Sequence, residues 1–209
     1  MTRSAIQHLD DADTRLRQWI RRIGPIRLPP RRSRDPYAAL LQSVVYQQLH
    51  GAAAKAIWNR VLDLFEDRDP QPERLIAMTE TRLRGAGLSR NKSLSLRAIA
   101  AGRLSGEIPD ERGMAQLDDR EIYGRLTQLR GVGPWTVEML MIFTLRRPDV
   151  MPATDFGIRK GFQITYRKLT MPKPKEILQK SECWRPYRTM ASLYLWRIAD
   201  ASKSKKAIS

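Results

Sequence analysis

The sequence predicts an all-α protein, for three reasons. Apolar residues recur at helical spacing along most of the chain, and no stretch of useful length alternates apolar and polar residues as a half-buried β-strand would. Asp, Ser or Pro stands at several positions where such a helical pattern begins. With 209 residues and a hydrophobic content of 42%, the chain can bury a substantial core as one compact unit or as two closely packed lobes.

An amphipathic helix that ends at Gly24-Pro25 is the first predicted element. Its apolar face is formed by Leu16, Trp19, Ile20 and Ile23. Residues 27–34 then hold two prolines and four arginines, which is typical of an extended linker. The linker fits a phosphate contact and a solvated segment equally well. We assign residues 1–34 to an N-terminal helix and a basic linker.

Residues 35–115 are predicted to form a helical lobe. Asp35-Pro36 supplies the cap and first position of a helix with a buried stripe that includes Leu40 and Val44. A second helix is expected from Ala52 to about Phe65. Further helices are predicted over residues 72–78, 79–84 and 89–102, and a loop over residues 106–113.

The break between the first two helices of this lobe is polar, with the sequence QQLH at residues 47–50. Its polar side chains have no obvious partner in the core. A solvated turn is the simpler interpretation, and a loop presented to a ligand is the alternative. Lys92 poses a similar choice between a solvated lysine and a phosphate contact.

Residues 116–201 begin with a short helix capped by Asp118, followed by Gly131-Val132-Gly133 and a second helix that starts at Pro134. Two glycines around one apolar residue let the chain reverse tightly and bring backbone N–H groups close to another surface. These groups lie at a helix N-terminus, where the helix dipole favours an anion. This pair of helices joined by a glycine turn is suited to bind a DNA phosphate. An ordinary helix–helix corner is the alternative interpretation.

Asp155 precedes a helix that carries Ile158 and Phe162, so a helix cap is its plain interpretation. A basic loop follows over residues 166–175, and another helix starts at Pro174. The last helix is expected over residues 186–201. The lysine-bearing residues 202–209 are expected to form a basic tail.

The net charge of +16, from 38 Lys and Arg against 22 Asp and Glu, favours a polyanionic partner. No apolar run approaches the roughly 18 residues that span a bilayer, and the N-terminus has no apolar signal-peptide core. We therefore expect an intracellular protein, cytoplasmic or nucleoid-associated, that binds nucleic acid and no membrane. The single cysteine, Cys183, excludes an intrachain disulfide and a four-cysteine iron–sulfur cluster, and two histidines are too few for a histidine-rich metal site.

Several motifs together resemble the helix-hairpin-helix (HhH-GPD) superfamily of DNA glycosylases, and within it the 3-methyladenine DNA glycosylase II (AlkA-like) branch. They are LRGVGPWT (129–136), PATDFGIRKGF (152–162), QQLH (47–50), GLS (87–89) with Lys92, and WRPYR (184–188) with Leu195-Trp196. The resemblance covers roughly residues 36 to 200, so residues 35–201 are expected to form one glycosylase unit. It implies a two-lobed fold with the active-site cleft between the lobes.

The resemblance also implies the roles of individual residues. Asp155 is the catalytic carboxylate, which stabilises an oxocarbenium-like sugar and can orient the attacking water. The implied base pocket consists of Trp135, Trp196, Met139 and Tyr187, of which Met139 departs from the tyrosine found in the branch. The implied DNA contacts are Gln48 as the wedge that replaces the extruded base, Leu49 beside it, His50 in the minor groove, Arg130, Gly131, Val132, Gly133, Thr136 and Lys160.

The implied activity is hydrolysis of alkylated purines, such as 3-methyladenine and 7-methylguanine, from duplex DNA by base flipping in base excision repair. Relatives with lyase activity have a lysine where this chain has Trp135, so a monofunctional enzyme is expected. No cofactor is required, although the backbone carbonyls of Thr127, Leu129 and Val132 could hold Na⁺ or K⁺. A monomer is expected.

Three other functions stay open. One is a glycosylase of the same fold for other damaged or mismatched bases. The second is a non-catalytic helix-hairpin-helix DNA-binding protein. A basic helical RNA-binding or ribosome-associated protein explains the charge but not the joint occurrence of the motifs.

Overall fold

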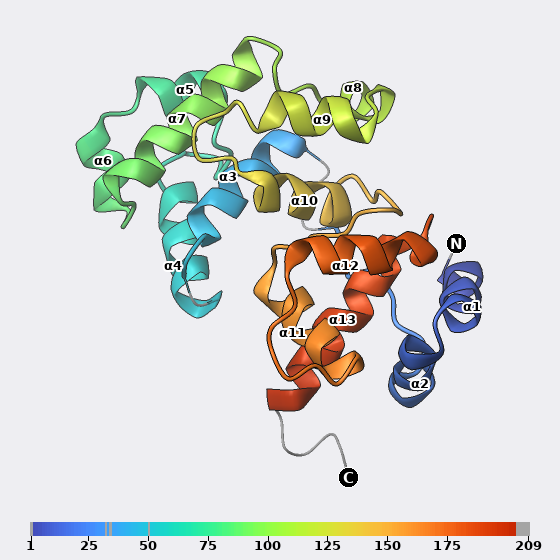
Figure 1. Ribbon diagram of the computed structural model, residues 1–209. Coiled ribbons are helices and arrows are strands. Elements are labelled where there is room, and N and C mark those ends of the chain that lie inside the picture. The colour runs from blue at the N-terminus through green and yellow to red at the C-terminus, as the bar shows by residue number, and fades with distance from the viewer. Residues whose placement is uncertain (1, 32, 34, 50, 204–209) are drawn as a thin grey trace. The chain divides into compact units, whose positions relative to one another are not determined.

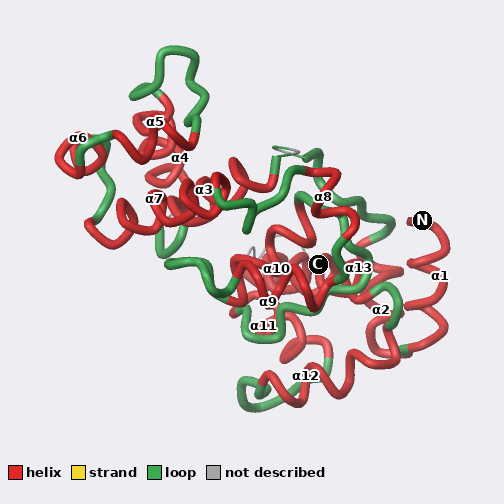
Figure 2. The backbone as a smooth tube through the Cα atoms, turned by 90° about the horizontal axis from the view of Figure 1, so that it is seen from above, coloured by secondary structure: helices red, strands yellow, loops and turns green. Residues whose placement is uncertain are grey.

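The computed structural model describes residues 2–31, 33, 35–49 and 51–203. Within these ranges it contains thirteen α-helices, one short 3-10 helix and no strand, which confirms the predicted all-α class (Figure 1, Figure 2). No helix of the same ranges is both long enough and apolar enough to cross a lipid bilayer.

The chain divides into two compact units. Unit 1 comprises residues 1–30 and 146–209, and unit 2 comprises residues 31–145. This grouping differs from the predicted ranges 1–34, 35–115, 116–201 and 202–209. The reason lies in the helix packing: the second hairpin helix packs against the first helix of unit 2, and the N-terminal helices pack against the C-terminal helix.

The described residues of unit 2 form eight helices. They are α3 (Pro36–Tyr46), α4 (Gly51–Leu62), α5 (Pro72–Ala77), α6 (Glu80–Gly85), α7 (Arg90–Leu104), α8 (Glu111–Gln116), α9 (Asp119–Leu126) and α10 (Pro134–Phe143). The Asp35 carboxylate accepts the backbone N–H groups of Tyr37 and Ala38 at 3.3 and 3.2 Å, as expected of a cap. The long helix α7 packs against α3 and α5, and α10 packs against α3 and α9.

The predicted loop over residues 106–113 is wrong in its second half. Asp110 accepts the N–H group of Gly113 at 2.8 Å and begins α8, whose Met114 is buried. The glycine within the sequence ERGMAQ concealed this short helix, because glycine has a low helix propensity.

Unit 1 contains α1 (Thr2–Ala12), α2 (Thr14–Ile23), α11 (Phe156–Thr165), α12 (Pro174–Ser181), the 3-10 helix η1 (Glu182–Trp184) and α13 (Arg188–Lys203). Helix α1 was not predicted from the sequence, although its Leu9 is fully buried. Helix α13 continues two residues beyond the predicted boundary at residue 201, and residues 204–209 lie outside the described ranges.

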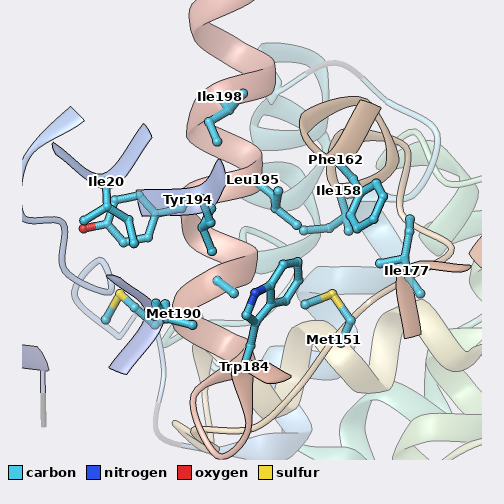
Figure 3. Close-up of a cluster of buried hydrophobic side chains, with 14 of the residues drawn as sticks. Ile20, Met151, Ile158, Phe162, Ile177, Trp184, Met190, Tyr194, Leu195 and Ile198 are labelled. Atoms are coloured by element: carbon cyan, nitrogen blue, oxygen red, sulfur yellow. The ribbon is translucent and has the colours of Figure 1, made fainter. Parts of the chain in front are cut away.

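The core of unit 1 forms around the large buried side chains of Trp184, Phe162 and Tyr194 (Figure 3). Asp13 is buried beside this core and caps α2. Its Oδ2 accepts the Trp184 indole N–H at 3.2 Å, the Tyr166 hydroxyl and the Lys180 ammonium. Burial alone would raise the pKa of Asp13, but these donors outweigh it and lower the pKa below its ordinary value. The polar network thus ties the N-terminal helices to the C-terminal half of the unit.

Candidate functional site

Asp155 is the N-cap of α11, as the sequence predicts. Its Oδ1 accepts the backbone N–H of Ile158 at 2.9 Å. The same oxygen accepts the indole N–H of Trp196, on α13, at 2.7 Å. Two donors from two helices therefore fix the orientation of a partly buried carboxylate at the positive end of a helix dipole.

Glycine residues on α11 allow α13 to approach this closely. A Cβ atom at Gly157 would lie 2.6 Å from Cδ1 of Trp196, and one at Gly161 would lie 2.6 Å from the carbonyl carbon of Leu195. Any side chain at these positions would push the helices apart. Trp196 is partly buried against the core of unit 1 and also bonds to Asp155, so it serves as core and as site neighbour.

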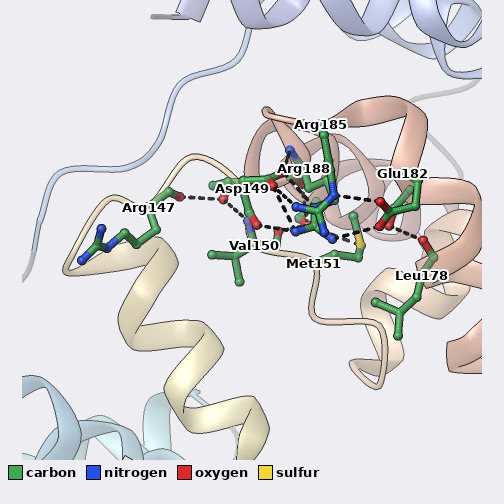
Figure 4. Close-up of polar contacts among 11 residues, drawn as sticks. Arg147, Asp149, Val150, Met151, Leu178, Glu182, Arg185 and Arg188 are labelled. Atoms are coloured by element: carbon green, nitrogen blue, oxygen red, sulfur yellow. Dashed lines mark hydrogen bonds and ion pairs between the residues drawn. The ribbon is translucent and has the colours of Figure 1, made fainter. Parts of the chain in front are cut away.

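The backbone that leads to Asp155 is clamped to the start of α13 (Figure 4). The Arg188 guanidinium donates to both carboxylate oxygens of Asp149, at 2.8 and 3.0 Å, and Arg185 adds a bond of 2.6 Å. The Thr189 hydroxyl donates to the Arg147 carbonyl at 2.7 Å and accepts the Val150 N–H at 3.0 Å. Burial would raise the pKa of Asp149, but its arginine partners hold the pKa below its ordinary value.

Other candidate residues of unit 1 have distinct surroundings. The Tyr187 ring packs edge-on against His8, 5.4 Å between centroids. Tyr187 directly precedes α13 and is partly buried against the core of unit 1, as Trp196 is, and its role in the base pocket stays a prediction. Lys160 donates to Gln163 of its own helix at 2.9 Å. Phe156, which directly follows Asp155 as the first residue of α11, is 64% exposed and was not among the predicted site residues.

The glycine hairpin of unit 2 joins α9 to α10. Asp118 and Glu121 form a reciprocal capping box at the start of α9. The Val132 N–H donates to the Leu129 carbonyl at 3.0 Å and closes the turn. Gly131 has a left-handed backbone (φ +81°), and a Cβ atom there would lie 2.5 Å from Cβ of Ser95. Only glycine satisfies both constraints.

The hairpin leaves backbone donors available. Within the described part of the chain, the N–H groups of Gly131 and Gly133 make no hydrogen bond. Gly133 also begins α10 without a side-chain cap. Unpaired N–H groups at a helix N-terminus are suited to an anion.

Around the hairpin, the predicted contacts differ in exposure. Arg130 is exposed and donates to Asn91 at 3.4 Å, and Trp135 is 37% exposed. Met139 lies one turn after Trp135 and is partly buried. Thr136 is only 1% exposed and its hydroxyl accepts a bond from Gln47, so its backbone N–H is the group left for the predicted DNA contact.

The predicted wedge loop follows α3. Gln48 has a left-handed backbone (φ +57°) and an exposed side chain, and Leu49 is also exposed. The prediction for His50 lies outside the described residues. Lys92 is partly buried, and its ammonium donates to the carbonyls of Val45 and Gln47, at 2.7 and 2.8 Å. Burial lowers the pKa of Lys92 below its ordinary value.

The predicted cation ligands belong to the hairpin. The Leu129 carbonyl already accepts the Val132 N–H and keeps one lone pair, whereas no bond to the carbonyls of Thr127 or Val132 occurs among the described residues. Carbonyl oxygens are suitable ligands for a monovalent cation. Within the described ranges, no group of three or more His, Cys, Asp or Glu side chains could hold a metal ion.

Comparison with known proteins identifies the family. Residues 41–186 match the family described as HhH-GPD superfamily base excision DNA repair protein. The match spans more than half of the chain. The protein therefore belongs to the HhH-GPD superfamily of base excision DNA repair proteins, as its motifs indicated.

Individual relatives cover nearly the whole chain. DNA-3-methyladenine glycosylase 1 of Schizosaccharomyces pombe is 39% identical over 203 residues, which are 94% of this chain and 88% of the relative. The solved structure of the 3-methyladenine DNA glycosylase of that yeast in complex with abasic DNA superimposes with a TM-score of 0.87 at 37% identity, covering 99% of each chain. A DNA-3-methyladenine glycosidase from Bacillus halodurans gives a TM-score of 0.86 at 31% identity, covering 97% of this chain and 92% of the other.

Proposed function

We propose that the protein is a DNA glycosylase that hydrolyses the N-glycosidic bond of alkylated purines, such as 3-methyladenine and 7-methylguanine, in duplex DNA. The observation that carries the proposal is the Asp155 carboxylate, held by two hydrogen bonds at the start of α11. The same conclusion is supported by the protein's membership of a family of base excision DNA repair proteins and by its relatives, which are named DNA-3-methyladenine glycosylases.

Asp155 supplies the charge that this reaction needs. As the base leaves, positive charge builds on the sugar, and a fixed carboxylate in a water-poor site stabilises it without having to reorganise. The bonds from Trp196 and Ile158 keep the carboxylate in place during this step. The carboxylate can also orient the water that completes hydrolysis.

Aromatic side chains suit the proposed substrates. Alkylation at N3 or N7 makes the purine cationic, and a cation on an aromatic ring gains roughly 1 to 2 kcal/mol when desolvated. Phe156 and Trp196 lie beside Asp155 and are the proposed partners of the base in unit 1. Trp135 and Met139 stay proposed base contacts.

We propose a monofunctional enzyme that leaves an abasic site. A lyase needs an amine nucleophile at the sugar, and position 135 holds a tryptophan instead. The nearest lysine in sequence after Asp155, Lys160, is engaged with Gln163. Borohydride reduction should therefore trap no covalent complex between the wild-type protein and DNA.

Duplex DNA is the proposed partner. The N–H groups of Gly131 and Gly133 would bind a phosphate, with a monovalent cation at the carbonyls of Thr127, Leu129 and Val132 as a proposed aid. Gln48 and Leu49 would enter the duplex. The net charge of +16 supports salt-sensitive DNA binding. All proposed groups come from one chain, so we propose a monomer. We also propose a cytoplasmic or nucleoid-associated location.

A substrate panel tests the proposal. Duplexes that carry 3-methyladenine, 7-methylguanine, an oxidised guanine or a mismatch are incubated with the protein, and free base is measured by chromatography. Release of the alkylated purines supports the proposal. Release from only the oxidised or mismatched duplexes would assign another substrate, and DNA binding with no release from any duplex would leave a non-catalytic DNA-binding protein.

A further inference from the structure

Gln47 connects two segments of unit 2 that are 84 residues apart in sequence. It ends α3, where its backbone N–H bonds to Ser43 and Val44. Its side-chain Nε2 donates to the carbonyl of Gly131, in the hairpin, at 3.0 Å and to the hydroxyl of Thr136, on α10, at 2.9 Å. The residue that directly precedes the exposed Gln48-Leu49 loop is thus bonded to the glycine hairpin.

The bond to Gly131 fixes one particular peptide group. The carbonyl of Gly131 accepts from Gln47, and the N–H of the same peptide unit, on Val132, donates to Leu129. Both polar ends of this peptide are therefore held. The N–H groups on either side of it, of Gly131 and Gly133, are the ones without a protein acceptor in the described chain. Fixing the central peptide sets the direction of the two free donors.

The other side of Gln47 is held just as firmly. The Lys92 ammonium donates to the Gln47 carbonyl at 2.8 Å and to the Val45 carbonyl at 2.7 Å. A cation is favourable there because these carbonyls form the negative end of α3. Gln48, with its left-handed backbone, directly follows Gln47. The exposed Gln48-Leu49 loop therefore begins at a residue whose position is fixed.

Helix α7 supports both segments. Lys92 holds the end of α3, and Ser95, one turn later, lies directly beneath Gly131. The sequence offered no sign of this arrangement beyond the unexplained polar break and the uncertain role of Lys92.

We propose that Gln47 is a positioning residue that holds the hairpin donors and the Gln48-Leu49 loop in one fixed register. Phosphate binding at the hairpin and entry of the loop into the duplex then occur together. This inference rests on the proposed function, since it assigns a role within the same DNA-binding site. Without the Gln47 side chain, the hairpin peptide can rotate, and the position of the loop relative to the bound phosphate is no longer fixed.

The salt dependence of DNA binding tests the hairpin half of this proposal. In Gln47→Met the side chain keeps its length but cannot donate. We expect binding to an undamaged duplex to weaken about tenfold, the effect of losing one or two hydrogen bonds. The slope of log K against log salt should become shallower by about 0.9, the value for one phosphate contact. A purely structural role would lower only the folded fraction and leave this slope unchanged.

Base extrusion tests the other half. The probe is a duplex with 2-aminopurine next to an abasic-site analogue, whose fluorescence rises when the loop unstacks the base. Gln47→Met should reduce this rise at saturating protein. Gln48→Gly, which suits the left-handed backbone but removes the wedge side chain, should reduce the rise and keep the wild-type salt slope.

The matched control is Gln116→Met, the same substitution at an exposed glutamine of α8 that makes no side-chain hydrogen bond among the described residues. It should keep both the slope and the fluorescence rise. If Gln47→Met does not fold, Gln47→Asn, which keeps the amide on a shorter side chain, replaces it.

A wild-type slope in the folded Gln47 variant would overturn the proposal, and so would a changed slope with an unchanged fluorescence rise. Neither measurement requires base release. If the wild-type protein releases no base while Gln47→Met shows both changes, the proposed function fails and the positioning role stands.

Discussion

The indole N–H of Trp196 and the backbone N–H of Ile158 donate to the same oxygen of Asp155, at 2.7 and 2.9 Å. One donor belongs to α13 and the other to α11, so the carboxylate is bonded to both helices. The glycines of α11 permit this approach. The position of Asp155 thus depends on how two helices of unit 1 pack, as well as on its own place at a helix start.

Replacing Trp196 with phenylalanine removes the indole donor and keeps an aromatic ring. A hydrogen bond to a charged group contributes about 1.5–3 kcal/mol, so the single-turnover rate of base release should fall about tenfold to a hundredfold. The dissociation constant for DNA should change little. The matched control is Trp19→Phe, whose indole N–H makes no hydrogen bond in the described chain. An unchanged rate in Trp196→Phe would show that this bond does not position the carboxylate.

Asp149→Asn should lower the free energy of unfolding by about 2 kcal/mol, because Arg188 loses a bidentate carboxylate partner in a partly buried site. Urea denaturation of the full chain measures the loss. Asp63→Asn breaks the exposed pair with Arg68 and should cost about 0.5 kcal/mol or less. Equal losses in the two variants would mean that the bonds between Asp149 and Arg188 contribute no more to stability than an exposed ion pair does.

The Asp149–Arg188 interaction also predicts how the stability of the protein depends on pH. The folded-state pKa of Asp149 lies below its unfolded value of about 4, so its carboxylate stabilises the fold above that pH. This contribution is lost as the pH falls through the folded-state pKa. Between about pH 5 and pH 2 the wild type should therefore lose more stability than Asp149→Asn. Parallel stability curves for the two proteins over this range would contradict the assignment.

Two glycine-to-alanine substitutions should have opposite effects. Gly131→Ala places a Cβ atom 2.5 Å from Ser95 on a left-handed backbone, and we expect a loss of about 1–3 kcal/mol together with weaker DNA binding. Gly124 lies in α9 with open space around it, so Gly124→Ala should stabilise the protein by about 0.5–1 kcal/mol. Thermal unfolding of both variants measures the two changes in stability. A stabilised Gly131→Ala would show that the hairpin does not require glycine at position 131.

Local patterns in the sequence predicted much of this structure. The caps at Asp35, Asp118 and Asp155 could be predicted because a cap depends on a few neighbouring residues, and the hairpin because only one residue separates its two glycines. Helix α8 was missed where a glycine weakened the helical signal. Contacts between distant segments were not predictable in this way. The bonds of Trp196 to Asp155 and of Gln47 to Gly131 join residues 41 and 84 positions apart, which no periodicity reveals.

The most direct test of the central claim compares base release by the wild type and by Asp155→Asn from a 3-methyladenine duplex at equal DNA occupancy. Asparagine can still cap α11 but carries no charge to stabilise the sugar. We predict that the variant binds DNA like the wild type and releases base at least about a hundredfold more slowly. Equal release by the two proteins would show that Asp155 is only a helix cap and would contradict the account.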